Sequence, residues 1–238
     1  MAQSQGGWRI CSKSPDSPAM KIILPKARAY IFDMDGTLTD NMHYHHLAWM
    51  KFIDEKQLGI DAETFERDYH KGTLIEVMAR FFRHLTTEEE LREVGNEKES
   101  LYRNTYGHLL QPLKGLHPFL DALKTKNIPL GLATMGDQNN LEMTLKQLKI
   151  TSYFHSTTGG DQVEKGKPHP EIFLTAAKKL GVAPQECLAF EDTASGIKAA
   201  QAAGMQVVGI ATQFSKEKLL ELGCAVSIKH YDKIIFHE

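Results

Sequence analysis

The sequence has little of what secreted and membrane-spanning proteins need. Its three cysteines among 238 residues are too few, and odd in number, for a disulfide framework, which indicates a reducing compartment. No apolar run approaches the ~20 residues that cross a bilayer. The segment Ile22-Ile23-Leu24 is too short for the apolar region of a signal peptide. We therefore expect a cytoplasmic protein without a membrane partner.

The net charge of the chain is also small. Lys and Arg number 28 against 30 Asp and Glu, which gives a formal net charge of -2, and the basic residues form no run of about five or six. Such a chain has no broad attraction for nucleic acid. Hydrophobic residues make up 42% and charged residues 24%, which is ordinary for a globular enzyme. We expect a monomer that acts on a small metabolite.

Three regions of the chain differ in pattern. Residues 1–27 are rich in Ser, Pro, Gly and Gln without any period and are expected to form a tail without catalytic residues. Residues 42–111 carry apolar residues at helical spacing, which predicts a helical block of about four helices. The apolar positions behind this prediction are Leu47, Met50 and Ile53; Leu74, Val77, Met78, Phe81 and Phe82; and Leu91, Val94, Leu101 and Tyr102.

The remaining residues, 28–41 and 112–238, alternate between short apolar runs and helical patterns. Strands are expected at 30–32, 128–134, 155–158, 187–190, 206–210 and 225–228, and helices at 116–126, 138–148, 170–180, 194–203 and 215–221. Gly181, Gly204 and Gly223 follow three of these helices, where a terminating glycine belongs. This alternation predicts an α/β fold, a doubly wound, Rossmann-like parallel sheet, with the helical domain inserted after the first strand.

In such a sheet the ligand site lies at the C-terminal ends of the strands, and the first strand ends in two carboxylates. Asp33 and Asp35 lie two residues apart, so that one can attack phosphorus while the other protonates the leaving oxygen. Gly36 permits a tight backbone turn beside a phosphate. The alternative is an ordinary acidic turn with solvated side chains.

Two further loops carry groups that suit a phosphate. Thr134 offers a hydroxyl donor, helped by the backbone N–H groups of Met135 and Gly136. Lys167 can neutralise both carboxylates and a phosphoryl group. The alternatives are a threonine that caps the next helix and an exposed loop lysine.

The loop after the strand at 187–190 supplies a second acidic pair. Adjacent carboxylates at Glu191 and Asp192 can hold a hard cation, Asp192 directly and Glu191 directly or through water. The alternative is helix capping by Asp192. Because the four loops should meet at one sheet edge, we favour a single Mg²⁺-dependent site for phosphoryl transfer.

These motifs resemble those of the haloacid dehalogenase superfamily over residues 28 to the C-terminus, with Asp33 to Thr37 as the first motif and Thr134, Lys167 and Glu191-Asp192 as the others. The resemblance implies an aspartyl-phosphate intermediate at Asp33 and acid–base work by Asp35. It also implies that Mg²⁺ is held by Asp33, the backbone carbonyl of Asp35 and Asp192. The helical insert resembles the family's small cap, and the presence of Asp35 argues against halide chemistry.

Within that superfamily the segment 41–49 resembles the β-phosphoglucomutase-like branch. The resemblance assigns substrate binding to cap positions: His45 as a hinge histidine, Lys71 and Gly72 as a loop over the substrate, and Lys98 as a lysine at the site. The alternative is that His45 and Lys98 are ordinary helix residues.

Two positions depart from the branch. Ile75 stands where the mutase holds a distal phosphate with an arginine, and Asp137 stands where it has a lysine. Both changes remove positive charge, and a bidentate arginine is not easily replaced. We therefore favour a phosphatase acting on a sugar phosphate or similar monoester. The alternatives are a β-phosphoglucomutase and a non-catalytic binding module.

Overall fold

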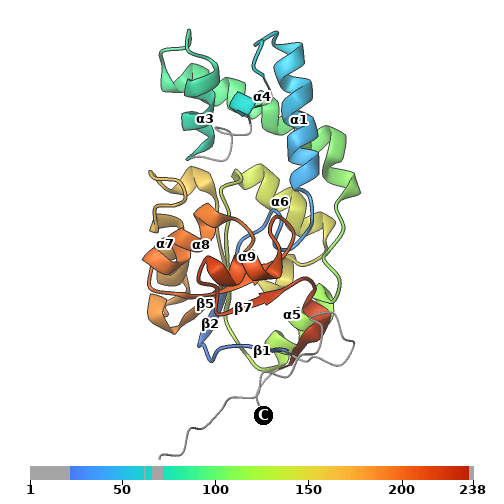
Figure 1. The fold of residues 1–238 in the computed structure, drawn as a ribbon, viewed down its shortest axis with the longest axis vertical. Helices are drawn as coiled ribbons and strands as arrows, with labels where there is room; N and C mark the ends of the chain where they lie inside the picture. Colours follow the sequence, from blue (N-terminus) through green and yellow to red (C-terminus); the bar gives the residue numbers. More distant parts are fainter. Residues whose placement is uncertain (1–21, 62, 66–71, 236–238) are drawn as a thin grey trace, which may run out of the picture.

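The computed structural model describes residues 22–61, 63–65 and 72–235, which form an α/β core with a helical cap (Figure 1). The main sheet has six parallel strands in the order β4-β3-β2-β5-β6-β7. They are β2 (Ala29–Phe32), β3 (Leu130–Ala133), β4 (Ser156–Thr158), β5 (Cys187–Glu191), β6 (Gln206–Ile210) and β7 (Val226–Ile228). The prediction of a doubly wound parallel sheet is confirmed.

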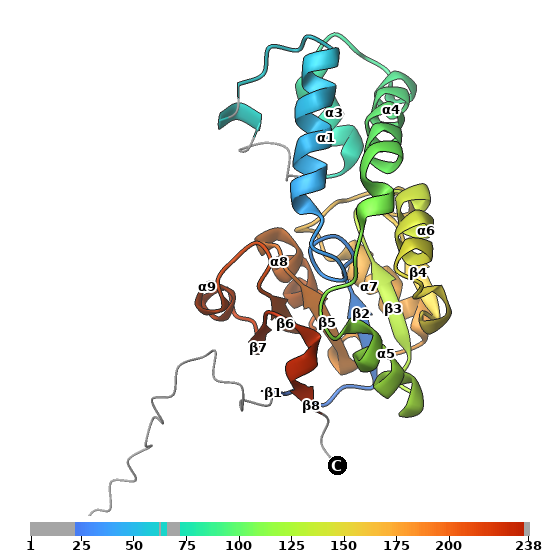
Figure 2. The same cartoon turned by 90° about the vertical axis from the view of Figure 1, so that its right-hand side faces the viewer.

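Helices cover both faces of this sheet, which explains why its strands are apolar on both sides. One face packs Tyr30 and Phe32 of β2 against α5 (Leu116–Thr125) and α6 (Gln138–Gln147). The opposite face packs smaller residues, among them Ala29 and Ile31, against the other three helices. These are α7 (Glu171–Leu180), α8 (Ala194–Ala202) and α9 (Lys216–Glu221), whose labels mark them in Figure 2.

The helix ends follow local sequence signals. Gly181, Gly204 and Gly223 have φ angles of 68°, 85° and 88°, as expected for glycines that end a helix in the left-handed region. Thr193 caps α8 by accepting a hydrogen bond from the backbone N–H of Gly196 at 3.1 Å. Because these signals act over three or four residues, the expected core helices agree with the observed ones to within two residues.

A second, two-stranded sheet was not predicted. The strand β1 (Ile22–Ile23) pairs in parallel with β8 (Ile234–Ile235), which uses part of the expected tail. A strand of two residues is too short to show the alternating pattern by which strands are recognised in a sequence. The rest of the expected tail, residues 1–21, lies outside the described residues.

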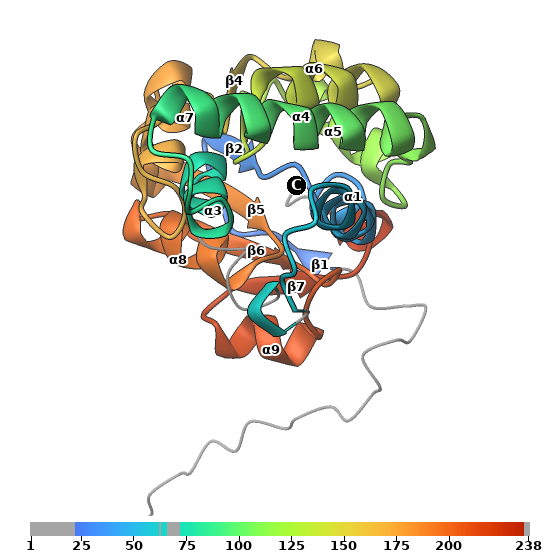
Figure 3. The ribbon, with the colours of Figure 1, turned by 90° about the horizontal axis from the view of Figure 1, so that it is seen from above.

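The cap lies between β2 and β3 in the chain and contributes α1 (Met42–Glu55), α3 (Leu74–Phe81) and α4 (Glu88–Tyr106). Seen from above, these helices are arranged around the end of the sheet where β2 and β5 finish (Figure 3). An apolar cluster of side chains from these helices and the segments between them holds the cap together; it comprises Trp49, Phe52, Ile53, Phe65, Val77, Met78, Phe82 and Leu91. The prediction of a helical cap inserted after the first strand is confirmed, whereas its limits at residues 42 and 111 stay a prediction.

Of the three apolar positions that indicated α1, only Ile53 is buried. Leu47 is 46% exposed and Met50 is only partly buried, whereas Trp49 and Phe52 are buried. The pattern 47, 50, 53 has a period of three, which drifts around a helix of 3.6 residues per turn. The two aromatic rings bury more surface than the aliphatic side chains and decide which face turns inward.

No helix in the described part of the chain is long and apolar enough to cross a membrane.

Candidate active site

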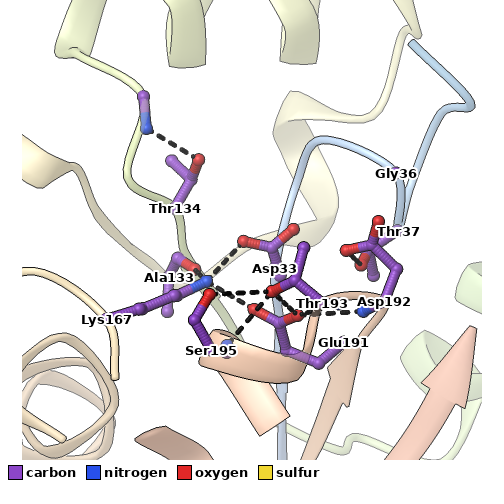
Figure 4. A network of polar contacts seen from close by, with 12 residues as sticks. Asp33, Gly36, Thr37, Ala133, Thr134, Lys167, Glu191, Asp192, Thr193 and Ser195 are labelled. Carbon is purple, nitrogen blue, oxygen red and sulfur yellow. Dashed lines mark hydrogen bonds and ion pairs between the residues drawn. The ribbon is translucent and has the colours of Figure 1, made fainter. Parts of the chain in front are cut away.

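Side chains from separate loops meet at the C-terminal ends of β2 and β5 (Figure 4). Carboxylate oxygens of Asp33, Glu191 and Asp192 lie within 4.8 Å of one another, and all three residues are buried. We call these three residues the carboxylate cluster. Lys167 enters it from the loop before α7, with its Nζ 2.6 Å from Asp33 Oδ1 and 2.6 Å from Glu191 Oε1.

Lys167 is buried together with its partners, and its Nζ also donates to the carbonyl of Ala133 at 3.3 Å. Burial alone lowers the pKa of Lys167, but the charges of Asp33 and Glu191 outweigh it and hold the pKa above its ordinary value. The ammonium is therefore charged at neutral pH. The alternative of an exposed loop lysine is wrong.

Glu191 is fully engaged by the protein. Its Oε1 accepts from Lys167, and its Oε2 accepts from the backbone N–H groups of Asp192 and Thr193, each at 2.9 Å, and from the Thr193 hydroxyl at 3.0 Å. The carboxylate thus lies over the N-terminus of α8, where the helix dipole favours an anion. A Cβ at Gly196 would overlap this carboxylate. Glu191 is better suited to fix Lys167 than to bind a cation directly.

Asp192 has weaker contacts. Its Oδ1 lies 3.4 Å from the Thr37 hydroxyl and its Oδ2 lies 3.3 Å from the Thr212 hydroxyl. Gly36 approaches so closely, at φ 77°, that a Cβ there would overlap Asp192. This carboxylate therefore keeps acceptor capacity for a ligand.

The charges of the carboxylate cluster do not balance. Three buried carboxylates face one ammonium, and burial, opposed by Lys167 and reinforced by Glu191, raises the pKa of Asp33 from its ordinary value of 3.8 to about 8. Burial, reinforced by the charges of Glu191 and Asp33 and opposed by Lys167, also raises the pKa of Asp192. A divalent cation removes this surplus of negative charge, and hard oxygen ligands are what Mg²⁺ prefers. Asp33 and Asp192 fit such an ion.

The Asp35 carboxylate lies outside the carboxylate cluster. Its Oδ1 accepts from Asn41 Nδ2 at 2.6 Å and lies 3.4 Å from His45 Nε2. Burial raises the pKa of Asp35, but the charge of the nearby His45 and the hydrogen bond from Asn41 outweigh it and lower the pKa. These contacts fix the position of the Asp35 side chain, while its expected acid–base role and the expected role of its backbone carbonyl in metal binding stay predictions.

Sequence reasoning missed Asn41. It stands at the start of α1 but does not cap the helix with its side chain. Instead its Oδ1 accepts from the backbone N–H of Gly36 at 3.1 Å, and its Nδ2 donates to Asp35 and, at 2.7 Å, to the Tyr102 hydroxyl. Its position directly after the acidic loop was the available signal.

Thr134, Met135 and Gly136 line a cavity of about 430 Å³ between cap and core, which Asp33 and Asp35 also line. The hydroxyl oxygen of Thr134 accepts from the backbone N–H of Gly136 at 3.0 Å. That N–H, expected from sequence to help bind a phosphate, is therefore already engaged.

The cap contributes three expected residues to this cavity, His45, Gly72 and Lys98. Lys98 is 1% exposed and its Nζ lies 4.8 Å above the Trp49 ring, so the alternative of a solvated helix lysine is wrong. Lys71 lies outside the described residues.

The two residues that depart from the mutase pattern are both in contact with other parts of the protein. Ile75 packs against the apolar cluster of the cap. Asp137 caps α6 and pairs with Arg103 of α4 at 3.1 Å.

Comparison with known proteins agrees with this geometry. A family model described as haloacid dehalogenase-like hydrolase matches residues 27–204. The β-phosphoglucomutase of Bacillus subtilis is 35% identical over 189 residues, which are 77% of this chain and 83% of that protein. The phosphorylated carbohydrates phosphatase of Thermotoga maritima is 30% identical over 84% of this chain and 94% of that protein. A family IA hydrolase structure from Entamoeba histolytica superposes with a TM-score of 0.78 at 30% identity, covering 87% of this chain and 95% of that one.

Proposed function

The chain belongs to the haloacid dehalogenase-like hydrolases and is a phosphoryl-transfer enzyme, and from that premise we propose that it is a Mg²⁺-dependent phosphatase of small phosphomonoesters. The observation that carries the proposal is the contact of Lys167 with both Asp33 and Glu191 at 2.6 Å, beside Asp192. Such a site combines an anionic nucleophile with positive charge for the phosphoryl oxygens.

In the first half-reaction an Asp33 carboxylate oxygen attacks phosphorus. The bond from Asp33 to phosphorus forms as the bond to the leaving oxygen breaks, and Asp35 gives its proton to that oxygen. The negative phosphoryl group favours protonation of Asp35, whose pKa is otherwise lowered. Lys167 neutralises charge on the phosphoryl group, and the Thr134 hydroxyl donates a hydrogen bond to one of its oxygens.

In the second half-reaction water attacks the phosphoaspartate. Asp35 accepts a proton from that water, and the bond between phosphorus and Asp33 breaks, which releases inorganic phosphate and restores Asp33. A bound Mg²⁺, held by Asp33 and Asp192, supplies positive charge that stabilises the phosphoryl oxygens.

A β-phosphoglucomutase is the second candidate, and the Bacillus relative of that name favours it. A mutase must hold a second phosphate and exclude water while a sugar hydroxyl attacks. Ile75 and Asp137 supply no positive charge for this purpose, and Asp137 is already paired with Arg103. Hydrolysis is therefore the better-supported outcome.

The test is hydrolysis of p-nitrophenyl phosphate by the purified protein with Mg²⁺ and with EDTA. We expect turnover that EDTA removes and added Mg²⁺ restores. Full activity in EDTA contradicts the metal role, and no turnover of any ester in a panel of phosphomonoesters contradicts the phosphatase proposal.

A second assay separates the two candidates. With β-glucose 1-phosphate and a trace of glucose 1,6-bisphosphate, a phosphatase releases inorganic phosphate, whereas a mutase makes glucose 6-phosphate. We expect phosphate release. Rapid formation of glucose 6-phosphate would establish the mutase instead.

A further inference from the structure

A buried carboxylate on the cap side of the cavity has no part in the chemistry proposed above. Glu99 of α4 is 7% exposed and lines the cavity next to Lys98. Its Oε1 accepts from Lys98 Nζ at 2.8 Å. A carboxylate is costly to bury unless it is paired, and the pairing with Lys98 offsets this cost. The pairing does not explain why a charged side chain lines this part of the cavity.

One amide group of the core fixes this carboxylate in place. Asn140 of α6 is 1% exposed, and its Nδ2 donates to Glu99 Oε2 at 2.6 Å. Its Oδ1 accepts from Arg103 Nη1 at 2.9 Å. Glu99 and Arg103 lie one turn apart on α4. The Glu99 carboxylate requires the NH₂ end of the Asn140 amide and the Arg103 guanidinium requires its oxygen, which sets the orientation of the amide. We call the set the cap–core network; it comprises Lys98, Glu99, Arg103, Asp137 and Asn140.

Each cation of the cap–core network already has a carboxylate partner. Lys98 pairs with Glu99, and Arg103 pairs with Asp137 at 3.1 Å. Lys98 is the only lysine or arginine among the described residues that line the cavity. Burial raises the pKa of Glu99, but Lys98 and His45 outweigh it and lower the pKa, so Glu99 is charged at neutral pH. A second phosphate on the substrate meets a carboxylate there, and like charges repel.

The same wall suits an uncharged group that carries hydroxyls. The Glu99 carboxylate has about four acceptor positions and uses two within the network, and an ammonium has three donors of which Lys98 gives one to Glu99. Hydroxyl groups of a substrate can donate hydrogen bonds to the Glu99 carboxylate and accept them from the Lys98 ammonium. Trp49, Leu74 and Val77 line the cavity beside them and offer apolar surface for C–H groups.

We propose that Glu99 is a specificity-determining residue that selects monophosphates of uncharged polyols and rejects bisphosphates. The inference rests on the proposed function, because it concerns the leaving group of that same hydrolysis. Asn140 acts as a positioning residue that holds the Glu99 carboxylate against the cavity.

The experiment compares kcat/KM for a monophosphate with kcat/KM for the bisphosphate of the same carbon skeleton. The monophosphate is the best one from a panel of hexose, pentose and glycerol monophosphates. We expect the wild-type protein to prefer it by at least about tenfold. In Glu99→Gln we expect kcat/KM for the monophosphate to fall about tenfold, as for a lost charged hydrogen bond, while that for the bisphosphate does not fall. The proposal is overturned if the ratio of kcat/KM for the monophosphate to kcat/KM for the bisphosphate is the same in Glu99→Gln as in the wild type. It is also overturned if the wild-type protein does not prefer the monophosphate.

Two variants make this comparison specific. Glu93→Gln places the same substitution on the exposed side of α4, and there we expect the ratio to stay within about twofold. Glu99→Asp keeps the charge and shortens the side chain, so it should still reject the bisphosphate while losing monophosphate turnover. Rejection lost in Glu99→Asp contradicts the charge argument, and this variant decides the matter if Glu99→Gln does not fold.

Hydrolysis of p-nitrophenyl phosphate separates this inference from the proposed function. That ester has no hydroxyl for Glu99 to contact, so its turnover by the wild-type protein tests only the chemistry at Asp33. Turnover of it together with an unchanged ratio in Glu99→Gln overturns the specificity inference alone. Absence of turnover with it and with every member of the panel overturns the proposed function as well.

Discussion

Two clusters of charged residues reach the cavity, the carboxylate cluster through Asp33 and the cap–core network through Lys98, Glu99 and Asn140, and they differ in how their charges balance. In the carboxylate cluster three carboxylates face Lys167 alone. In the cap–core network each cation has its own carboxylate, and Asn140 joins the two pairs. Surplus negative charge equips the carboxylate cluster to take up a cation, whereas balanced charge equips the cap–core network to sort uncharged groups.

The largest effect should come from the nucleophile of the carboxylate cluster. We expect Asp33→Ala to lower turnover of p-nitrophenyl phosphate about 10⁴-fold or more, because no other group can form the covalent intermediate. Asp40→Ala, at the exposed end of the same loop, is the matched control and should keep turnover within about threefold. Equal loss in both variants, with both folded by circular dichroism, contradicts the assignment.

The next effect tests what holds the cap together. Because apolar packing, not charge, makes the cap core, Phe52→Ala should lower the free energy of unfolding by about 3–5 kcal/mol, since Phe52 is 2% exposed. Leu47→Ala on the same helix should change it by less than about 0.5 kcal/mol, because Leu47 is 46% exposed. Urea titration measures both. Similar losses at the two positions would show that the observed face of α1 is wrong.

A glycine pair separates backbone strain from crowding at the carboxylate cluster. Gly36 and Gly181 have similar φ angles of 77° and 68°, but only at Gly36 would a Cβ overlap another group, Asp192. We expect Gly181→Ala to cost about 1 kcal/mol and Gly36→Ala about 2–4 kcal/mol with loss of turnover. Thermal melts and the chromogenic assay give the two readouts. Equal costs with normal turnover in Gly36→Ala would contradict the crowding.

The smallest effect is the pH dependence of the carboxylate cluster. Because the pKa of Asp33 is raised from 3.8 to about 8, the metal-free protein loses stability as pH rises between these values. Bound Mg²⁺ competes with that proton, so its affinity should rise with pH up to about 8, by at most about 1.4 kcal/mol per unit for one proton.

Calorimetric titration of Mg²⁺ between pH 6 and pH 9 measures this dependence. Glu99→Gln is the control, because the cap–core network takes no part in metal binding and the slope should be unchanged. A Mg²⁺ affinity that does not change with pH in the wild-type protein contradicts the raised pKa of Asp33. A changed pH dependence in Glu99→Gln means that the cap–core network influences the carboxylate cluster.

The core of the fold was predictable because each signal acts over a few residues. Alternating strands and helices, capping residues and terminating glycines such as Gly181 fixed the elements, and the rule that ligands lie at strand ends joined their loops. The site was expected at Asp33, Lys167 and Asp192, and these three meet in the structure. Their chemical roles stay predictions until the variants are measured.

The cap was less predictable. Leu47 was one of the apolar positions that indicated α1, yet it is 46% exposed, because packing of Trp49 and Phe52 decides which face of the helix is buried. The roles expected for His45 and Lys98 stay predictions, although both line the cavity. Glu99 and Asn140 carried no motif and were missed.

Local patterns in the chain were enough to predict the parallel sheet, the inserted cap and the order of the loops that bear Asp33, Thr134, Lys167 and Glu191-Asp192. The contact of Glu191 with Lys167 and that of Glu99 with Asn140, 41 residues away in the chain, emerge only from the packing of separate elements. The reason is physical: period and capping depend on neighbours within a turn or two, whereas a buried charge finds its partner only when separate elements pack together.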